Sequence, residues 1–301
     1  MNNEIKFLHN SEIDIHRWDQ VVGEAINSRV YALSWYLSIL HPDWHGLVYG
    51  DYEYVMPVIF SKKWGIRYMY QPVYAQQHGI FPPSESEITK QFISFLQKKF
   101  RYFNVSLNSL NDFKDMGVKI EERKNYILPL DRPYTEISSQ YSSHTKRYVK
   151  KANSVSVISN QITLDDFQKL KDKYGKPAMK REYFLKLKMI ISHSLEKKEG
   201  SICGVYSKNN ELYAAAFFLK GKDRFVYLNP VSSVEGKQQR SMYAIIDNFI
   251  REHAGQPFLL DFEGSTVEGI ARFFEGFGAR PETFQHLNYN NLPLFIRLLK
   301  K

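Results

Sequence analysis

Two carboxylates, two residues apart, follow an apolar segment in the last sixth of the chain. Asp261 and Glu263 come after Phe258–Leu260, a run typical of a buried strand. Side chains two apart on a strand share a face, and ligands bind at the carboxyl ends of strands in α/β sheets. A carboxylate there can accept a proton from an amine, so we predict that Glu263 and Asp261 are catalytic. In the structural alternative, Asp261 pairs with a basic neighbour and Glu263 flanks a turn. In that turn, Ser265 and Glu268 form a capping box.

The preceding strand carries two further polar candidates. Tyr227 and Asn229 lie two residues apart in the run Phe225–Asn229, so a strand puts both side chains on one face. Tyr227 could donate a proton or bind a carbonyl oxygen, and we predict a catalytic role for it. We predict that Asn229 contacts the substrate. The alternative is that Tyr227 belongs to the core, where aromatic residues mostly lie.

A polar loop leads from that strand into a helix. The loop Val231–Ser241 precedes Met242–Ile250, whose apolar residues recur at helical spacing. Backbone N–H groups at a helix N-terminus bind phosphate groups, so we predict a site for a phosphate-bearing ligand here. The alternative is a solvated surface loop. The predicted binding residues are Gly236, Lys237, Gln238, Gln239, Arg240 and Ser241.

An earlier basic segment provides a second candidate anion site. Lys146 and Lys150 are four residues apart, as are Arg147 and Lys151, so a helix carries these four cations on adjacent ridges beside Tyr148. Such a face suits the phosphates of tRNA or of a phosphorylated donor. The alternative is that the run is only a solvated helix face.

The loop Gln71–Ile80 in the first half gathers amides, an aromatic ring and a histidine, but no basic residue. We predict that Gln77 and His78 contribute to an acceptor cleft or an interdomain contact, and not to a phosphate site. His78 could also serve as a general base, although lone histidines mostly satisfy local hydrogen bonds.

The composition limits the classes of function. With 301 residues, 43% of them hydrophobic, the chain can form two domains or one large one. A net charge of +9 favours polyanionic partners such as nucleic acid, CoA or anionic lipid headgroups. Cys203 is the single cysteine, so an internal disulfide is excluded and a buried thiol is expected. Motifs for dinucleotides, nucleoside triphosphates, zinc peptidases and serine hydrolases are missing from the sequence. We expect no metal, signal peptide or membrane span, and a cytoplasmic location.

The elements that position these candidates occur twice in the same order: helices, three strand-like runs joined by tight turns, a helix and a strand. A helix that feeds a strand in this way is typical of a parallel crossover. The repeated order predicts a structural duplication. The strand-like runs of the first half are 46–49, 54–60, 66–70 and 103–107, with a helix from 88 to 100 before the last. Those of the second half are 201–206, 212–219, 225–229 and 258–262, with helices at 164–174, 181–195, 242–250 and 270–277 and final strands at 279–285 and 292–299.

This order, together with several segments of the second half, resembles the GNAT acyltransferases, and in particular the Fem-like branch, in which two GNAT-type domains are fused. The segments are Tyr126–Leu130, Tyr141–Ala152, Tyr227–Pro230, Glu235-Gly236, Leu260–Ser265 and Arg272–Ala279. The resemblance implies an α/β fold with a mixed (α+β) sheet and two fused GNAT-like domains. Each domain is an antiparallel meander plus a parallel strand, flanked by helices. With the joint at Leu128–Pro133, the domains are residues 1–130 and 131–301, and the second carries the donor site.

The resemblance also implies acyl transfer to an amine. In the GNAT fold a backbone N–H on the splayed fourth strand polarises the donor carbonyl, and the following helix holds the donor's pyrophosphate. An acyl-CoA donor then lies between residues 227–241 and 261–265, beside the helix 146–151. One alternative is a Fem-like enzyme that uses aminoacyl-tRNA and modifies a cell-wall precursor. The candidate insertion for a long tRNA-binding arm, residues 164–199, has the length of about two ordinary helices and lacks sustained heptads, which weakens this alternative. Another is a non-catalytic scaffold, which the glycine-poor donor loop would suit.

Overall fold

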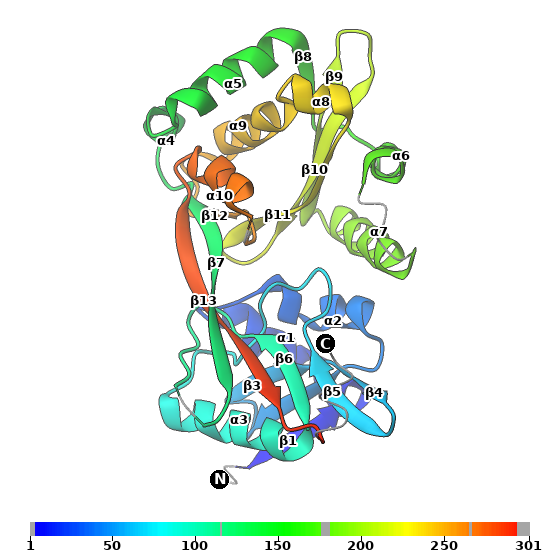
Figure 1. Cartoon of the computed structure of the whole chain (residues 1–301), viewed down its shortest axis with the longest axis vertical. Coiled ribbons are helices and arrows are strands. Elements are labelled where there is room, and N and C mark those ends of the chain that lie inside the picture. The colour runs from blue at the N-terminus through cyan, green and yellow to red at the C-terminus, as the bar shows by residue number, and fades with distance from the viewer. Residues whose placement is uncertain (1–3, 115, 176–180, 265–266, 294–301) are drawn as a thin grey trace. The chain divides into compact units, whose positions relative to one another are not determined.

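The computed structural model describes residues 4–114, 116–175, 181–264 and 267–293 (Figure 1). The chain divides into two compact units, Met1–Arg123 with Thr283–Lys301, and Lys124–Glu282. This division differs from the expected boundary at residue 130, because the end of the chain returns to the first unit. There β13 (Arg280–Asn290) pairs with β6 (Tyr102–Ser106). None of the helices in the described ranges is both long and apolar enough to cross a membrane.

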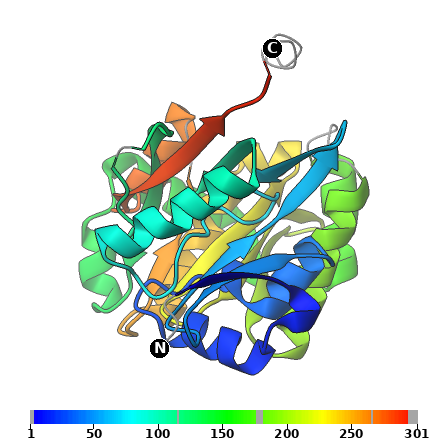
Figure 2. The ribbon, with the colours of Figure 1, turned by 90° about the horizontal axis from the view of Figure 1, so that it is seen from below.

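The first unit has one antiparallel sheet and a second set of strands under a helix. The antiparallel sheet is β1 (Ile5–His9), β2 (His45–Tyr49) and β3 (Tyr54–Val58). The second set is β4 (Phe60–Lys63), β5 (Ile66–Tyr70), β6 and β13, side by side in that order. The helices are η1 (Asn10–Glu12), α1 (Ile15–Glu24), η2 (Val30–Ala32), α2 (Ser34–Leu40) and α3 (Ser86–Lys99). α3 covers the second set (Figure 2), since its buried residues Phe92 and Leu96 share one core with Phe103 and Leu287.

The prediction of a three-strand meander in this unit was wrong in one respect. The expected strand 54–60 is broken at Ile59 into β3 and β4. β3 pairs with β2, whereas β4 pairs with β5. The break lets one continuous apolar run serve two sheets. The expected parallel crossover is confirmed, because β5 and β6 pair in parallel through α3.

The second unit is built on a mixed sheet in the order β7, β12, β11, β10, β9, β8. Its strands are β7 (Lys119–Pro129), β8 (Ser156–Ser159), β9 (Gly200–Ser207), β10 (Leu212–Lys220), β11 (Arg224–Ser232) and β12 (Leu259–Asp261). Its helices are α4 (Tyr134–Ser139), α5 (Ser143–Val155), α6 (Leu164–Tyr174), α7 (Arg181–Glu196), α8 (Val234–Gln238), α9 (Ser241–His253) and α10 (Glu268–Glu275). Figure 1 shows α5 and α9 on one face of the sheet and α6 and α7 on the other. The meander β9–β10–β11 and the parallel strand β12 confirm the predicted order.

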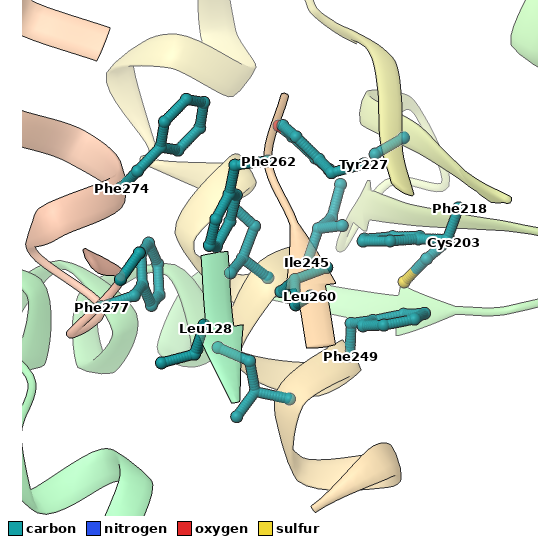
Figure 3. Close-up of a cluster of buried hydrophobic side chains, with 14 of the residues drawn as sticks. Leu128, Cys203, Phe218, Tyr227, Ile245, Phe249, Leu260, Phe262, Phe274 and Phe277 are labelled. Carbon is teal, nitrogen blue, oxygen red and sulfur yellow. The ribbon is translucent and has the colours of Figure 1, made fainter. Parts of the chain in front are cut away.

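The core of this unit is aromatic (Figure 3). Phe218 of β10 stacks on Phe249 of α9, with ring centroids 3.7 Å apart. Cys203 lies in the same cluster, as expected, and burial raises the pKa of its thiol to about 12. Strands β7 and β8 were not expected. Of the predicted final strands, the first is longer than expected as β13, and most of 292–299 lies outside the described residues.

Candidate functional site

Strands β11 and β12 part at the place where the donor was predicted. Their parallel pairing joins Arg224–Val226 to Leu259–Asp261 and ends there, while β11 continues to Ser232. On its other edge, β11 shifts register against β10 between Ala215 and Phe217. Asn229 in this bulge has a φ of +57°. Beyond Val226, β11 no longer pairs with β12 in the part of the chain described here, and we call this end of the pairing, at Val226 and Asp261, the β11–β12 notch.

Three aromatic rings pack together next to the end of the β11–β12 pairing. Tyr227 lies 5.9 Å from Phe262 and 6.3 Å from Phe274, centroid to centroid, and the two phenylalanines stack at 4.6 Å (Figure 3). The Tyr227 side chain is only 4% exposed, and burial raises its pKa well above the usual value. The tyrosine therefore stays neutral and belongs to the aromatic core, as its structural alternative described. Its hydroxyl can donate a hydrogen bond but cannot act as a base.

Asp261 is held in a buried ion pair. One of its carboxylate oxygens accepts from Arg224 Nη1 at 2.8 Å, and the other accepts from the N–H of Glu263 at 2.9 Å. Arg224 also contacts Asp223 and Glu282, both at 3.3 Å. Burial alone would lower the Arg224 pKa, but these carboxylates raise it. Asp261 thus pairs with a basic neighbour, so its contribution to the site is to hold the backbone of Glu263.

Glu263 follows β12 by two residues and so lies next to the end of the β11–β12 pairing. It is half-buried and has a φ of +57°, a left-handed conformation that costs a residue with a Cβ about 1–2 kcal/mol. Such strain is often found at functional sites. The predicted capping box of Ser265 and Glu268 falls partly outside the described residues, and α10 begins at Glu268 with Val267 as its N-cap. Ser265 lies outside the described residues.

The loop after β11 contains one short helix and then the start of a longer one. Ser233 caps α8 by accepting from the N–H of Gly236 at 2.9 Å. A Cβ on Gly236 would come within 2.2 Å of the Tyr213 carbonyl oxygen, so this glycine allows α8 to pack on β10. Arg240, with a φ of +63°, is the N-cap residue of α9. Ser241 is fully buried, and its Oγ has no hydrogen-bond partner among the described residues.

The basic helix α5 packs beside this loop. Lys151 Nζ donates to the Gln238 carbonyl oxygen at 3.0 Å. The Arg240 guanidinium lies 4.5 Å from the centre of the Tyr148 ring, and that ring contacts Tyr243 at 5.1 Å. Arg147 lies over the same Tyr148 ring at 5.2 Å. We call Arg147, Lys151 and Arg240 the basic cluster.

Other predicted cations are less closely involved. Lys146 donates to the carbonyl oxygen of Ser139 at 2.8 Å, and Lys150 and Lys237 are exposed. Of the two predicted amide residues, Gln238 accepts the hydrogen bond of Lys151 through its backbone oxygen, and Gln239 is the C-cap residue of α8.

Sequence reasoning missed Lys171. This lysine of α6 is buried, and its Nζ contacts both the side-chain oxygen of Asn229 and, at 3.2 Å, the backbone oxygen of the same residue. A cation is thereby held at the bulge of β11. The only signal in the sequence was a lysine on the apolar ridge of α6 that also carries Phe167 and Leu170.

The equivalent place in the first unit is closed by hydrogen bonds. Past β5, the N–H of Gln71 donates to Asn104 O at 3.0 Å and the N–H of His78 donates to Ser106 O at 2.9 Å, so the loop stays attached to β6. Gln77 and His78 are both buried. The His78 Nε2 lies 3.2 Å from the Tyr31 carbonyl oxygen, and burial lowers its pKa to about 4. His78 is therefore neutral at pH 7 and satisfied by its local contacts.

A cavity of about 670 Å³ opens on the α6 side of the second unit. Its lining combines the carboxylates of Asp166, Glu211 and Glu235 with Lys169 and Lys173, along with three tyrosines. The mixed charge gives the cavity no single preferred ligand class. Within the described ranges, histidine, cysteine, aspartate and glutamate side chains form no group of three or more that could hold a metal.

The sequence matches no protein-family model and no curated protein. The structure is similar to that of FemX, with a TM-score of 0.68 and 13% identity over 98% of this chain and 100% of that one. It is also similar to a tandem GNAT protein from the clavulanic acid biosynthesis pathway, with a TM-score of 0.56 and 10% identity over 96% and 99% of the two chains. The C-terminal domain of a putative lysylphosphatidylglycerol synthetase from Agrobacterium fabrum gives 0.54 and 10% over 92% of each chain. These likenesses confirm the predicted fold class: the chain has the mixed α/β fold of double GNAT-like proteins.

Proposed function

We propose that this chain is an N-acyltransferase that binds an acyl-CoA in the notch between β11 and β12 and transfers the acyl group to an amine. The observation that supports this most directly is the end of strand pairing at Val226 and Asp261, after which β11 continues unpaired with β12 to Ser232 and the loop that leads to α9. A carbonyl placed in such a notch can accept a hydrogen bond from the uncovered β11 backbone.

The charges around the notch support a phosphate-bearing donor. The N-terminus of α9 and the basic cluster lie together at one end of β11, where helix dipole and cations both favour an anion. The buried hydroxyl of Ser241 adds a donor at the first residue of the helix. The single glycine of the loop is used for packing against Tyr213, so phosphate binding here depends on side-chain cations.

The proposed chemistry uses few residues. Glu263 accepts a proton from the attacking amine, and the nitrogen then forms a bond to the donor carbonyl carbon. Backbone N–H groups of β11 and the ammonium of Lys171 stabilise the negative oxygen that develops. The C–S bond breaks, and the leaving CoA thiolate takes up the proton that Glu263 accepted from the amine, which restores the Glu263 carboxylate. Tyr227 is too weak an acid for that step, so we assign it hydrogen bonding only.

Ligand-dependent stabilisation tests the donor directly. We expect the melting temperature to rise in millimolar CoA or acetyl-CoA, because a ligand that binds only the folded state stabilises it by about 2.7 kcal/mol at 100 times Kd. Alanine at Arg240 and Lys151 together is expected to abolish the shift. Alanine at Lys208, an exposed lysine in the β9–β10 turn, is the matched control. An unchanged melting temperature with every CoA ester would exclude a CoA-dependent enzyme.

Aminoacyl-tRNA is the second candidate donor. The overall likeness to FemX and the basic residues of α5, Arg147 and Lys151, favour it. Helices α6 and α7 span 11 and 16 residues, so they are ordinary helices and not a long arm. Gel shifts with tRNA at several salt concentrations would identify this donor. If neither CoA esters nor tRNA bind, a binding scaffold is the remaining assignment.

A further inference from the structure

The β4–β5 hairpin of the first unit ends in an exposed tryptophan that folding does not explain. β4 and β5 pair Lys63 with Ile66, so Trp64 and Gly65 are the two residues of the turn. Both have positive φ, +51° for Trp64 and +78° for Gly65. Two-residue turns of this kind favour Asn-Gly, because a bulky side chain at the first position is strained. The tryptophan is also 67% exposed. It therefore carries both a conformational cost and an exposed apolar surface.

The residues around this tryptophan are all basic or apolar. Lys62, Lys63 and Arg67 are exposed, and Lys63 Nζ lies 4.7 Å from the centre of the indole. The sequence has no aspartate or glutamate between Glu53 and Glu85. The hairpin tip, which we define as Lys62–Arg67, thus combines one large amphipathic ring with three exposed cations that form no ion pair with any residue the structure describes.

This combination matches the surface of an anionic bilayer. Tryptophan prefers the headgroup region, where its ring is in an apolar layer and its N–H meets water. Cations near anionic lipid gain attraction from the negative surface potential. Sheet proteins that bind nucleic acid offer a groove or several stacking rings, whereas the turn at this tip presents a single indole at the end of a narrow hairpin.

We propose that the hairpin tip docks the protein reversibly on anionic phospholipid membranes. Trp64 enters the headgroup layer, and Lys62, Lys63 and Arg67 contact lipid phosphates. One ring and three cations give weak binding, since stable anchoring needs more than one strong signal. The site is separate from the β11–β12 notch, so it stands or falls independently of the proposed acyl transfer.

Vesicle binding by the full chain tests the docking. We expect sedimentation with vesicles of phosphatidylcholine and phosphatidylglycerol, and little with phosphatidylcholine alone. Each lysine-to-alanine change at positions 62 and 63 is expected to weaken binding roughly fivefold, the equivalent of about 1 kcal/mol. Trp64→Ala is expected to weaken it on the order of tenfold. Ile26→Ala, which removes a 74% exposed apolar side chain elsewhere in the same unit, is the matched control and is expected to bind normally.

Trp64→Asn separates docking from a structural role. Asparagine suits the left-handed turn position, so this variant is expected to be at least as stable as the parent and still to lose vesicle binding. Fluorescence gives a second readout, because Trp64 is exposed, whereas Trp18 and Trp44 are fully buried and Trp35 is half-buried. We expect anionic vesicles to shift the emission to shorter wavelength in the parent and in Ile26→Ala, but not in Trp64→Asn. Equal binding by parent and Trp64→Asn, no binding to either vesicle, or tip-dependent binding to RNA alone would each overturn the proposal.

Discussion

The two units differ at the place where a GNAT-like sheet opens. In the second unit, β11 and β12 pair over three residues and then part. In the first, the loop after β5 donates from Gln71 and His78 back to β6, so the corresponding opening is closed. The charges differ in the same sense: Lys151 contacts the loop after β11 and Arg240 belongs to it, whereas Gln71–Ile80 has no basic residue. In our proposal, the second unit keeps an open donor notch, whereas the first unit uses the corresponding loop for packing. We therefore propose a single donor site, in the second unit.

Replacing Glu263, the proposed base, is expected to have the largest effect on activity at the open notch. Glu263→Gln keeps size and hydrogen bonding but cannot accept a proton at neutral pH. We expect kcat to fall by about 10²- to 10⁴-fold, with an unchanged melting temperature. Glu268→Gln, at an exposed carboxylate of α10 paired with Arg272, is the control and should retain activity. Full activity in Glu263→Gln would return this residue to a structural role.

Replacing Asp261 should lower the free energy of unfolding more than it changes the charge near the notch. Asp261→Ala leaves Arg224 buried without its closest partner, and such changes cost about 3–5 kcal/mol. Urea unfolding would measure this loss. Replacing both residues, as in Asp261→Leu with Arg224→Met, is expected to recover much of it. A single variant as stable as the parent would show that the pair does not hold β12.

The closed loop of the first unit should make that unit sensitive to acid. His78 has a pKa of about 4 when folded, below its usual 6.5. Its contribution to stability is then complete above pH 6.5 and is lost as the pH falls towards 4. At pH 5 the loss is about 2 kcal/mol. We expect His78→Gln to reduce the dependence of unfolding free energy on pH between 7 and 5, while the exposed His16→Gln leaves it unchanged. The remaining dependence comes in part from His286, whose pKa burial also lowers to about 4. A parallel pH dependence in all three proteins would contradict the assignment.

The smallest effect is expected from single cations of the basic cluster. Arg240→Ala removes one charge from the α9 N-terminus and its contact with Tyr148. We expect the KM for the donor to rise roughly tenfold, equivalent to about 1.4 kcal/mol, with little change in kcat. Lys208→Ala should leave both constants unchanged. A fall in kcat with an unchanged KM would mean that Arg240 acts on the reaction step and not on donor binding.

The sequence was most informative where hydrophobic period and turn residues agreed. The turns at Lys208–Glu211 and Lys220–Asp223 correctly predicted β9, β10 and β11, and the apolar run before Asp261 predicted β12. Periodicity failed at Ile59, because an uninterrupted apolar run does not show where one strand leaves a sheet and another begins.

Contacts distant in sequence could not be predicted from the chain. The pairing of Asp261 with Arg224 was expected only as an unspecified basic neighbour, and the contact of Lys171 with Asn229 was not expected at all. Both depend on how α6 and β12 are placed against β11. The packing of Gly236 against the backbone of Tyr213, which lies on another strand, was not expected for the same reason.

Hydrogen–deuterium exchange with a non-reactive thioether analogue of acetyl-CoA would test the single-notch account most directly. The account predicts slower exchange in residues 227–244, where the β11 backbone and the α9 N-terminus meet the donor, and no change in residues 71–81. Protection of residues 71–81, or no protection in either region at saturating analogue, would contradict it.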